Sequence, residues 1–136
     1  MNKVWIGSGV VFILLIILDM IIHGVLLSPI YSTMEGMMRP QAEMKSWIIF
    51  VVDAVVAYFF TLIFSKGYEN KGIAEGVRYG LYIGLMFGIS MGYGSYASMP
   101  IPYSLALQWF LYTIAEFILC GIALSIVFKP KAAATA

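Results

Sequence analysis

Four titratable side chains within strongly apolar segments are the residues of this sequence that could carry chemistry. Asp19, Asp53 and Glu116 lie in runs apolar enough to sit in lipid, and His23 is the one basic group at similar depth. A charged side chain at the centre of a bilayer costs about 2.5 to 3.5 kcal/mol on insertion scales. Each carboxylate must therefore be paired, protonated or next to a cation, so the sequence predicts binding of protons or a small cation.

The spacing of these groups allows a functional and a structural interpretation. Asp19 and His23 are four residues apart and share one helix face. They could bind a ligand, or they could be a local hydrogen-bonded pair that only fixes helix packing. Glu116 has no basic residue within four positions on its own helix, so it needs a proton or a partner on another helix. It belongs to a partly polar stripe that recurs every four residues: Gln108, Tyr112, Glu116 and Cys120.

Asp53 and Arg78 complete the set of candidate site residues. Asp53 follows Trp47 by six residues, and we favour an interfacial acid that reaches solvent. Arg78 lies near the expected cytoplasmic edge of its helix. Its guanidinium could reach toward Glu116, pair with Glu75 three residues earlier, or extend to water.

Few residues suit metal, haem or nucleophilic chemistry. Cys120 is the single cysteine, which excludes an internal disulfide and favours an inert packing role. Cu(I) binding by soft thioethers is an alternative, although no M-x-M or histidine cluster accompanies the methionines. Haem would require His23 from two copies. No phosphate loop, catalytic triad or zinc-spaced motif is present, so we expect no enzymatic activity, metal or cofactor. The methionines expected in the outer half are Met34, Met37, Met38, Met44, Met91 and Met99.

The elements that must position these residues are transmembrane helices. With 62% apolar and 11% charged residues among 136, the chain is expected to be one integral membrane domain. A net charge of +1 gives no indication of nucleic-acid binding. Crossing about 30 Å of hydrocarbon takes about 20 helical residues. Four runs approach or exceed this length and predict an all-α, four-helix transmembrane bundle: residues 4–27, 47–64, 73–92 and 103–128.

The distribution of lysine and arginine predicts the orientation of this bundle. Four spans place both termini and the middle connection on one side of the membrane. The expected outer side has only Arg39 and Lys45, so the positive-inside rule makes both termini cytoplasmic. The basic residues on the other side are Lys3, Lys66, Lys71, Arg78, Lys129 and Lys131.

Two local signals concern the connections between spans. Ser32 followed by Glu35 has the spacing of a capping box and predicts a short outer interfacial helix over residues 33–39. Asn70 is expected to cap the third span.

Glycine recurs at every fourth position of the third span. Four residues advance a helix by about 400°, so the glycine stripe drifts by about 40° at each step. The partner must therefore cross with right-handed geometry, or two neighbours must share the stripe. The sequence does not decide whether the partner helix belongs to the same chain or to another copy in an oligomer. The helix-packing candidates are Gly72, Gly76, Gly80, Gly84, Gly88 and Gly92.

Three segments carry a resemblance to known proteins: LDMIIHGVLLSPIY in the first span, MRPQAEM in the outer connection, and SKGYENKGIAEGVRYG entering the third. Through them most of the chain resembles small bacterial four-span inner-membrane proteins, a group without an agreed activity. The resemblance implies a bacterial inner-membrane location and carries over no functional residue.

Our leading hypothesis is a self-associating bundle whose buried acids bind or relay a proton or small cation, with Glu116 and Asp19 as the main carriers. The alternative is a non-catalytic subunit or assembly factor of a larger membrane complex that docks through the glycine series. The expected partners are the lipid bilayer and either further copies of the chain or other membrane subunits.

Overall fold

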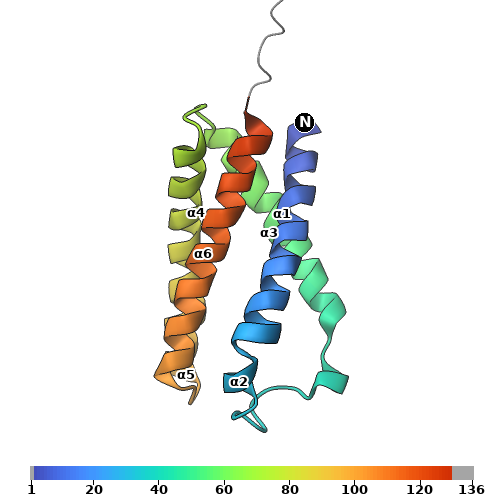
Figure 1. Ribbon diagram of the computed structural model, residues 1–136, viewed down its shortest axis with the longest axis vertical. Helices are drawn as coiled ribbons and strands as arrows, with labels where there is room; N and C mark the ends of the chain where they lie inside the picture. The colour runs from blue at the N-terminus through green and yellow to red at the C-terminus, as the bar shows by residue number, and fades with distance from the viewer. Residues whose placement is uncertain (1, 130–136) are drawn as a thin grey trace, which may run out of the picture.

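The computed structural model describes residues 2–129, which form a bundle of long helices with no strand among them (Figure 1). The predicted all-α fold is confirmed. Two of the long helices continue through π-helical turns, which contain one extra residue per turn. The elements in chain order are α1 (Asn2–Ile21), η1 (Ile22–Leu26), α2 (Ser28–Tyr31), η2 (Gln41–Glu43), α3 (Ser46–Gly67), α4 (Ile73–Gly88), η3 (Ile89–Gly94), α5 (Ser95–Ser98) and α6 (Tyr103–Phe128).

Three helical segments in the described part of the chain are long and apolar enough to cross a membrane: Asn2–Leu26, Ser46–Gly67 and Tyr103–Phe128. Residues 73–92, the remaining predicted span, are also helical through α4 and most of η3. They are less apolar because glycine adds little hydrophobicity and because Glu75 and Arg78 lie in the first turns. Membrane crossing by this segment therefore stays a prediction.

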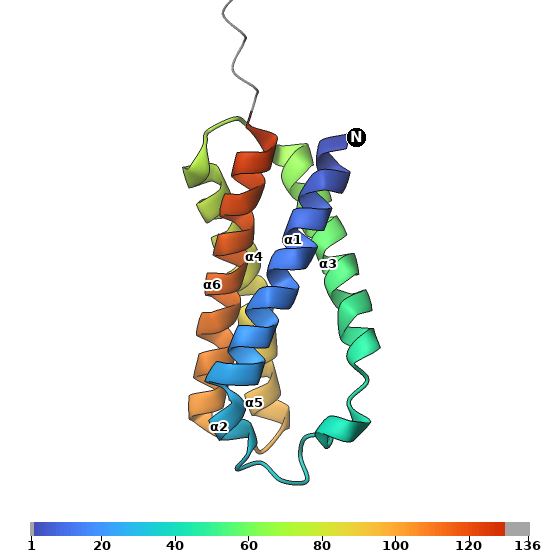
Figure 2. The ribbon, with the colours of Figure 1, turned by 45° about the vertical axis from the view of Figure 1, so that its right-hand side comes forward.

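The bundle has two distinct ends (Figures 1 and 2). At one, which we call the terminal end, α1 begins, α6 ends and the chain passes from α3 to α4. The opposite end holds α2, η2 and α5. This arrangement brings the beginning of α1 and the end of α6 to the same end of the bundle.

The contact between α4 and α6 is the closest in the bundle. Gly76, Gly80, Gly84, Gly88 and Gly92 all face α6 of the same chain. A Cβ atom on Gly80 would collide with the Phe117 carbonyl, and one on Gly84 would lie 2.8 Å from the Ile114 Cα. Gly72 is the exception, because its Cβ would meet nothing within 4 Å. Its φ of +73° instead serves the turn before α4.

Two apolar clusters fill the bundle, one toward each end. The terminal cluster joins α1, α3 and α6, and the opposite cluster joins η1, α6 and the connections. The buried residues of the terminal cluster are Val11, Leu15, Ala57, Phe60, Phe64, Phe117, Cys120, Leu124 and Phe128. Those of the opposite cluster are Ile22, Leu27, Met34, Ile101, Leu105 and Ala106.

The connection from α1 to α3 differs from the prediction. Residues 33–39 form turns and bends, and the helical residues are those of α2 and η2 on either side. The predicted helix is wrong because Ser32 does not cap it. The Ser32 hydroxyl donates a hydrogen bond back to the Pro29 carbonyl at 2.7 Å.

The connection from α3 to α4 is held by Glu75 and not by the predicted Asn70 cap. The buried Glu75 carboxylate accepts the backbone N–H groups of Glu69 and Lys71 at 2.6 and 2.8 Å. Arg78 is therefore not paired with Glu75, and its guanidinium lies 3.9 Å from the Glu69 carboxylate. The Lys71 ammonium also pairs with Glu69. This hydrogen bond and the positive charge lower the pKa of the Glu69 carboxyl from its usual value.

The glycine contact predicts a measurable asymmetry between two alanine substitutions. Gly80→Ala places a methyl group against the α6 backbone and is expected to destabilise the bundle by about 1–3 kcal/mol. The control is Gly9→Ala on α1, where nothing lies within 4 Å of the added atom and alanine favours the helix by about 1 kcal/mol. Titration with sodium dodecyl sulfate, followed by circular dichroism, compares the midpoints. Equal midpoints for both variants would contradict the packing described here.

Candidate site of buried carboxylates

Three carboxylates from three helices gather between the two apolar clusters. Asp19 comes from α1, Asp53 from α3 and Glu116 from α6. Asp53 is 7% exposed and Glu116 is 9% exposed. The prediction that Asp53 reaches solvent is therefore wrong, because α3 turns this side chain into the bundle.

Two of these carboxylates have a buried oxygen without a hydrogen-bond partner. They are Oδ2 of Asp53 and Oε1 of Glu116. A buried carboxylate that is neither paired nor hydrogen-bonded is strongly unfavourable in a low dielectric, whereas a protonated carboxyl carries no net charge. A proton bound to either of these carboxyls would remove this cost.

His23 links this group of acids to an aromatic pair. Its Nε2 lies 3.7 Å from Oδ1 of Asp19, and its Nδ1 lies 2.6 Å from the Tyr31 hydroxyl oxygen. The Trp109 indole N–H donates to the same hydroxyl at 2.8 Å. Since indole can only donate, the Tyr31 hydroxyl hydrogen is free to point at Nδ1 of His23. This assignment leaves the Nε2 hydrogen of His23 directed toward Asp19.

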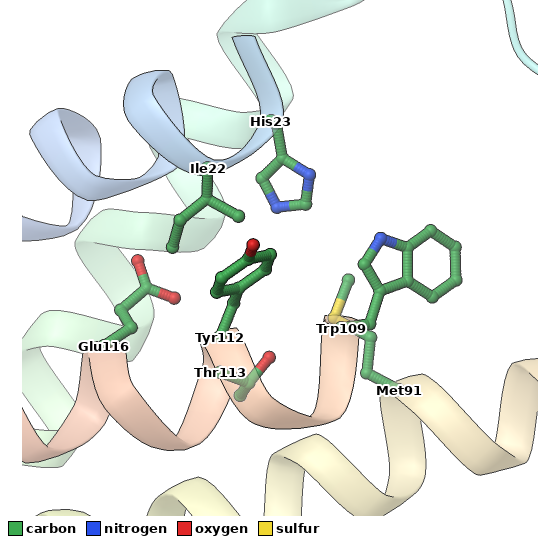
Figure 3. Close-up of a pocket in the computed structure, with 7 residues that line it drawn as sticks. All are labelled: Ile22, His23, Met91, Trp109, Tyr112, Thr113 and Glu116. Carbon is green, nitrogen blue, oxygen red and sulfur yellow. The ribbon is translucent and has the colours of Figure 1, made fainter. Parts of the chain in front are cut away.

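A small cavity lies between Glu116 and His23 (Figure 3). Its volume is about 10 Å³, which is room for about one water molecule. Figure 3 shows the Glu116 carboxyl group on one side of the Tyr112 ring and the His23 imidazole on the other. The cavity lining comprises Ile22, His23, Met91, Trp109, Tyr112, Thr113 and Glu116.

Both π-helical turns border this cavity. His23 and Ile22 lie in η1, and Met91 lies in η3. The η1 turn is defined by the Leu27 N–H, which donates to the Ile22 carbonyl five residues earlier at 2.8 Å. Such turns are rare in helices and occur frequently at functional sites. Their convergence on one small cavity supports its assignment as the candidate site.

Sequence reasoning missed the roles of Tyr31 and Trp109. Tyr31 is eight residues from His23 in the sequence, with Pro29 between them. The position of Trp109 directly after Gln108 in the polar stripe of α6 was the available signal. Neither spacing predicts their shared hydrogen bond, because it joins segments 78 residues apart.

Arg78 does not belong to this site. Its side chain is half exposed at the terminal end and faces Glu69. Cys120 is fully buried in the terminal apolar cluster. Among residues 2–129, no three side chains of histidine, cysteine, aspartate or glutamate are placed to hold one metal ion. Of the six methionines considered for copper, Met34 is packed in the opposite cluster.

Comparison with known proteins does not assign a function to this geometry. No family model, no curated protein and no solved structure matches the chain. The resemblance to small bacterial four-span membrane proteins therefore stays a prediction, and function has to be argued from the side chains themselves.

The hydrogen bond between Trp109 and Tyr31 predicts a change in tryptophan fluorescence. Trp5→Phe and Trp47→Phe leave Trp109 as the only tryptophan. In this background, Tyr31→Phe removes the acceptor of the indole N–H, so Trp109 emission is expected to move to shorter wavelength. Tyr103→Phe is the control, because the Tyr103 hydroxyl lies 3.3 Å from that of Tyr93 instead. Equal emission shifts in both variants would rule out the hydrogen bond between Trp109 and Tyr31.

Proposed function

We propose that the chain is a multi-pass protein of the bacterial inner membrane with four spans and both termini on the cytoplasmic side. The positions of the basic residues support this orientation. Among the described residues, Lys3, Lys66, Lys71, Arg78 and Lys129 belong to the terminal end, whereas only Arg39 and Lys45 precede α3 at the opposite end. The side with more lysine and arginine faces the cytoplasm in most membrane proteins. The opposite end would then face outward.

The function that we propose for the site is reversible binding of a proton by Glu116, with Asp19 and Asp53 as neighbouring acceptors. The observation that carries this proposal is the buried, unpartnered Oε1 of Glu116 next to a cavity for about one water molecule. A proton neutralises the carboxylate without needing further ligands. A hydrated metal cation would need more oxygen ligands and more space than the cavity provides.

Protons would move between the outer side of the membrane and the carboxylates through His23 and Tyr31. The His23 side chain is 40% exposed, and its two nitrogens face the Tyr31 hydroxyl and the Asp19 carboxylate. A histidine can accept a proton on one nitrogen and release it from the other. This pair therefore offers a route between the outer interface and the carboxylates.

Passage toward the cytoplasmic side would have to cross the terminal apolar cluster. Within residues 2–129, Thr61 is the one buried hydroxyl without a hydrogen-bond partner, and it lies two turns beyond Asp53 on α3. A hydroxyl can both donate and accept a proton. We therefore propose that the Thr61 hydroxyl would pass protons between the carboxylates and the terminal end.

Proton binding predicts a protonated carboxylic acid in the protein at neutral pH. Infrared spectra of the reconstituted protein should show the carbonyl stretch of such a group. Glu116→Gln is expected to remove most of this band because it removes the buried carboxyl that lines the small cavity. Glu43→Gln should leave it unchanged, since Glu43 is exposed outside the long helices. A wild-type spectrum without the band would refute the proposed protonation.

Relay across the membrane predicts a second, separable effect. Vesicles containing the protein and a pH-sensitive dye should change lumen pH under an imposed gradient, and Glu116→Gln should abolish the protein-dependent part. Thr61→Val should slow this change at least tenfold while keeping the infrared band, because no other buried hydroxyl among residues 2–129 is without a hydrogen-bond partner. Equal rates of lumen pH change with wild type and both variants would reject proton transport. Proton binding without transport would then be the remaining function of the site.

The alternative role, a subunit that docks through its glycine series, has less support. Five of the six glycines face α6 of the same chain. This surface is therefore occupied within the chain, and a subunit would have to dock through another face. Self-association also remains a prediction.

A further inference from the structure

A second hollow lies on another side of the bundle, between α3 and α4. Its volume is about 250 Å³, and its surface is almost wholly apolar. The two helices follow each other in the chain, yet α3 leans away from α4 below their connection (Figure 1). We call this hollow the α3–α4 groove. Its principal lining residues are Val55, Phe59, Ile63, Ile83, Met86 and Phe117.

The side chains that line the groove are apolar except for Tyr79, whose hydroxyl already has a hydrogen-bond partner. Tyr79 is the one lining residue with a polar side-chain atom, and its hydroxyl donates to the Phe60 carbonyl at 2.7 Å. This hydrogen bond joins α4 to α3 near the terminal end. A ligand in the groove would therefore find no free donor or acceptor on the side chains that line it. Only a hydrocarbon chain matches such a surface without leaving buried polar groups unsatisfied.

The size of the groove also limits its occupant. An α-helix with its side chains is about 10–12 Å wide, so a helix of another chain could insert only single side chains into a space of this volume. An acyl chain is narrower and can follow a groove between two helices. In the membrane position proposed above, Val55 and Met86 would lie among the acyl chains, because both are more than half exposed.

Lys66 lies at the terminal rim of the groove. It follows Phe59 and Ile63 by seven and three residues, so it lies on the same face of α3, one turn nearer the terminal end. Lys66 has no ion pair or side-chain hydrogen bond to residues 2–129. By contrast, Lys71 and Arg78 face Glu69, and the Lys3 ammonium donates to the Phe128 carbonyl at 2.9 Å. An exposed cation above an apolar groove is complementary to an anionic headgroup attached to an acyl chain.

We propose that the α3–α4 groove binds one acyl chain of an anionic phospholipid whose phosphate lies beside Lys66. This inference uses the proposed membrane position and does not depend on proton binding by Glu116. The two sites lie on different sides of α6, because Phe117 forms part of the groove while Glu116 lines the small cavity. The specific lipid is distinguished from surrounding lipid by its retention after extraction.

Native mass spectrometry after gentle extraction tests the proposal. The probe is an equimolar mixture of phosphatidylglycerol and phosphatidylethanolamine with identical acyl chains. Wild type is expected to retain one phosphatidylglycerol in preference to phosphatidylethanolamine. Lys66→Gln should lower this preference about fivefold, the effect of about 1 kcal/mol for one lysine near an anionic surface. Total retained lipid should stay the same in this variant.

A matched pair of substitutions tests the acyl-chain part. Val55→Trp fills the groove and should reduce retained lipid severalfold, whereas Val52→Trp should not. Both valines are on α3 and 51% exposed, and only Val55 lines the groove. Circular dichroism establishes that both variants remain helical. Equal lipid retention by the two variants, an unchanged headgroup preference in Lys66→Gln, or a dimer that Val55→Trp abolishes would each overturn the proposal.

Discussion

The direct contact between the backbones of α4 and α6 fixes the rest of the bundle. Glycines on α4 allow an approach that any Cβ atom would block, and this contact sets the rotation of α6 about its own axis. On α6, the residues that face the glycines include Phe110, Ile114 and Phe117. At about 100° per residue, Glu116 then lies about a third of a turn away from that face, on the side of the bundle where η1 and His23 lie.

This rotation explains why an acid is found in the middle of an apolar helix. Placed toward lipid, the Glu116 carboxyl would meet only hydrocarbon, and placed toward α4 it would prevent the close contact. The remaining direction leads toward η1, where Ile22 and His23 line the same small cavity and Asp19 lies one turn earlier on α1. Since like charges in a low dielectric repel strongly, binding of a proton by one of these acids, as proposed above, would relieve that repulsion. The contact between α4 and α6 thus also determines the direction in which the Glu116 side chain points.

The sequence predicted the helical fold and most helix boundaries because apolar runs and glycine spacing are local properties. The span predicted over residues 103–128 coincides with α6, and the span predicted from residue 73 begins where α4 begins. Residues whose environment depends on neighbouring helices were not predicted. The burial of Asp53 depends on the rotation of α3, and its distance from Trp47 along the chain carries no information about that rotation. The bond between Tyr31 and Trp109 likewise requires the path of the chain after η1, and a π-helical turn has no reliable sequence signal.

The division of α4 into two faces also accounts for the α3–α4 groove. The glycine face packs on α6, so the larger side chains of α4, including Ile83 and Met86, point toward α3 and keep that helix at a distance. Backbones approach this closely only where the facing residues are small, and α4 has such residues on one face only. In a bilayer, an apolar gap of this kind has to be filled by hydrocarbon, because water there would find no polar partners. A lipid chain in the groove would therefore complete the packing that the protein itself leaves open, and Lys66 would determine which lipid supplies it.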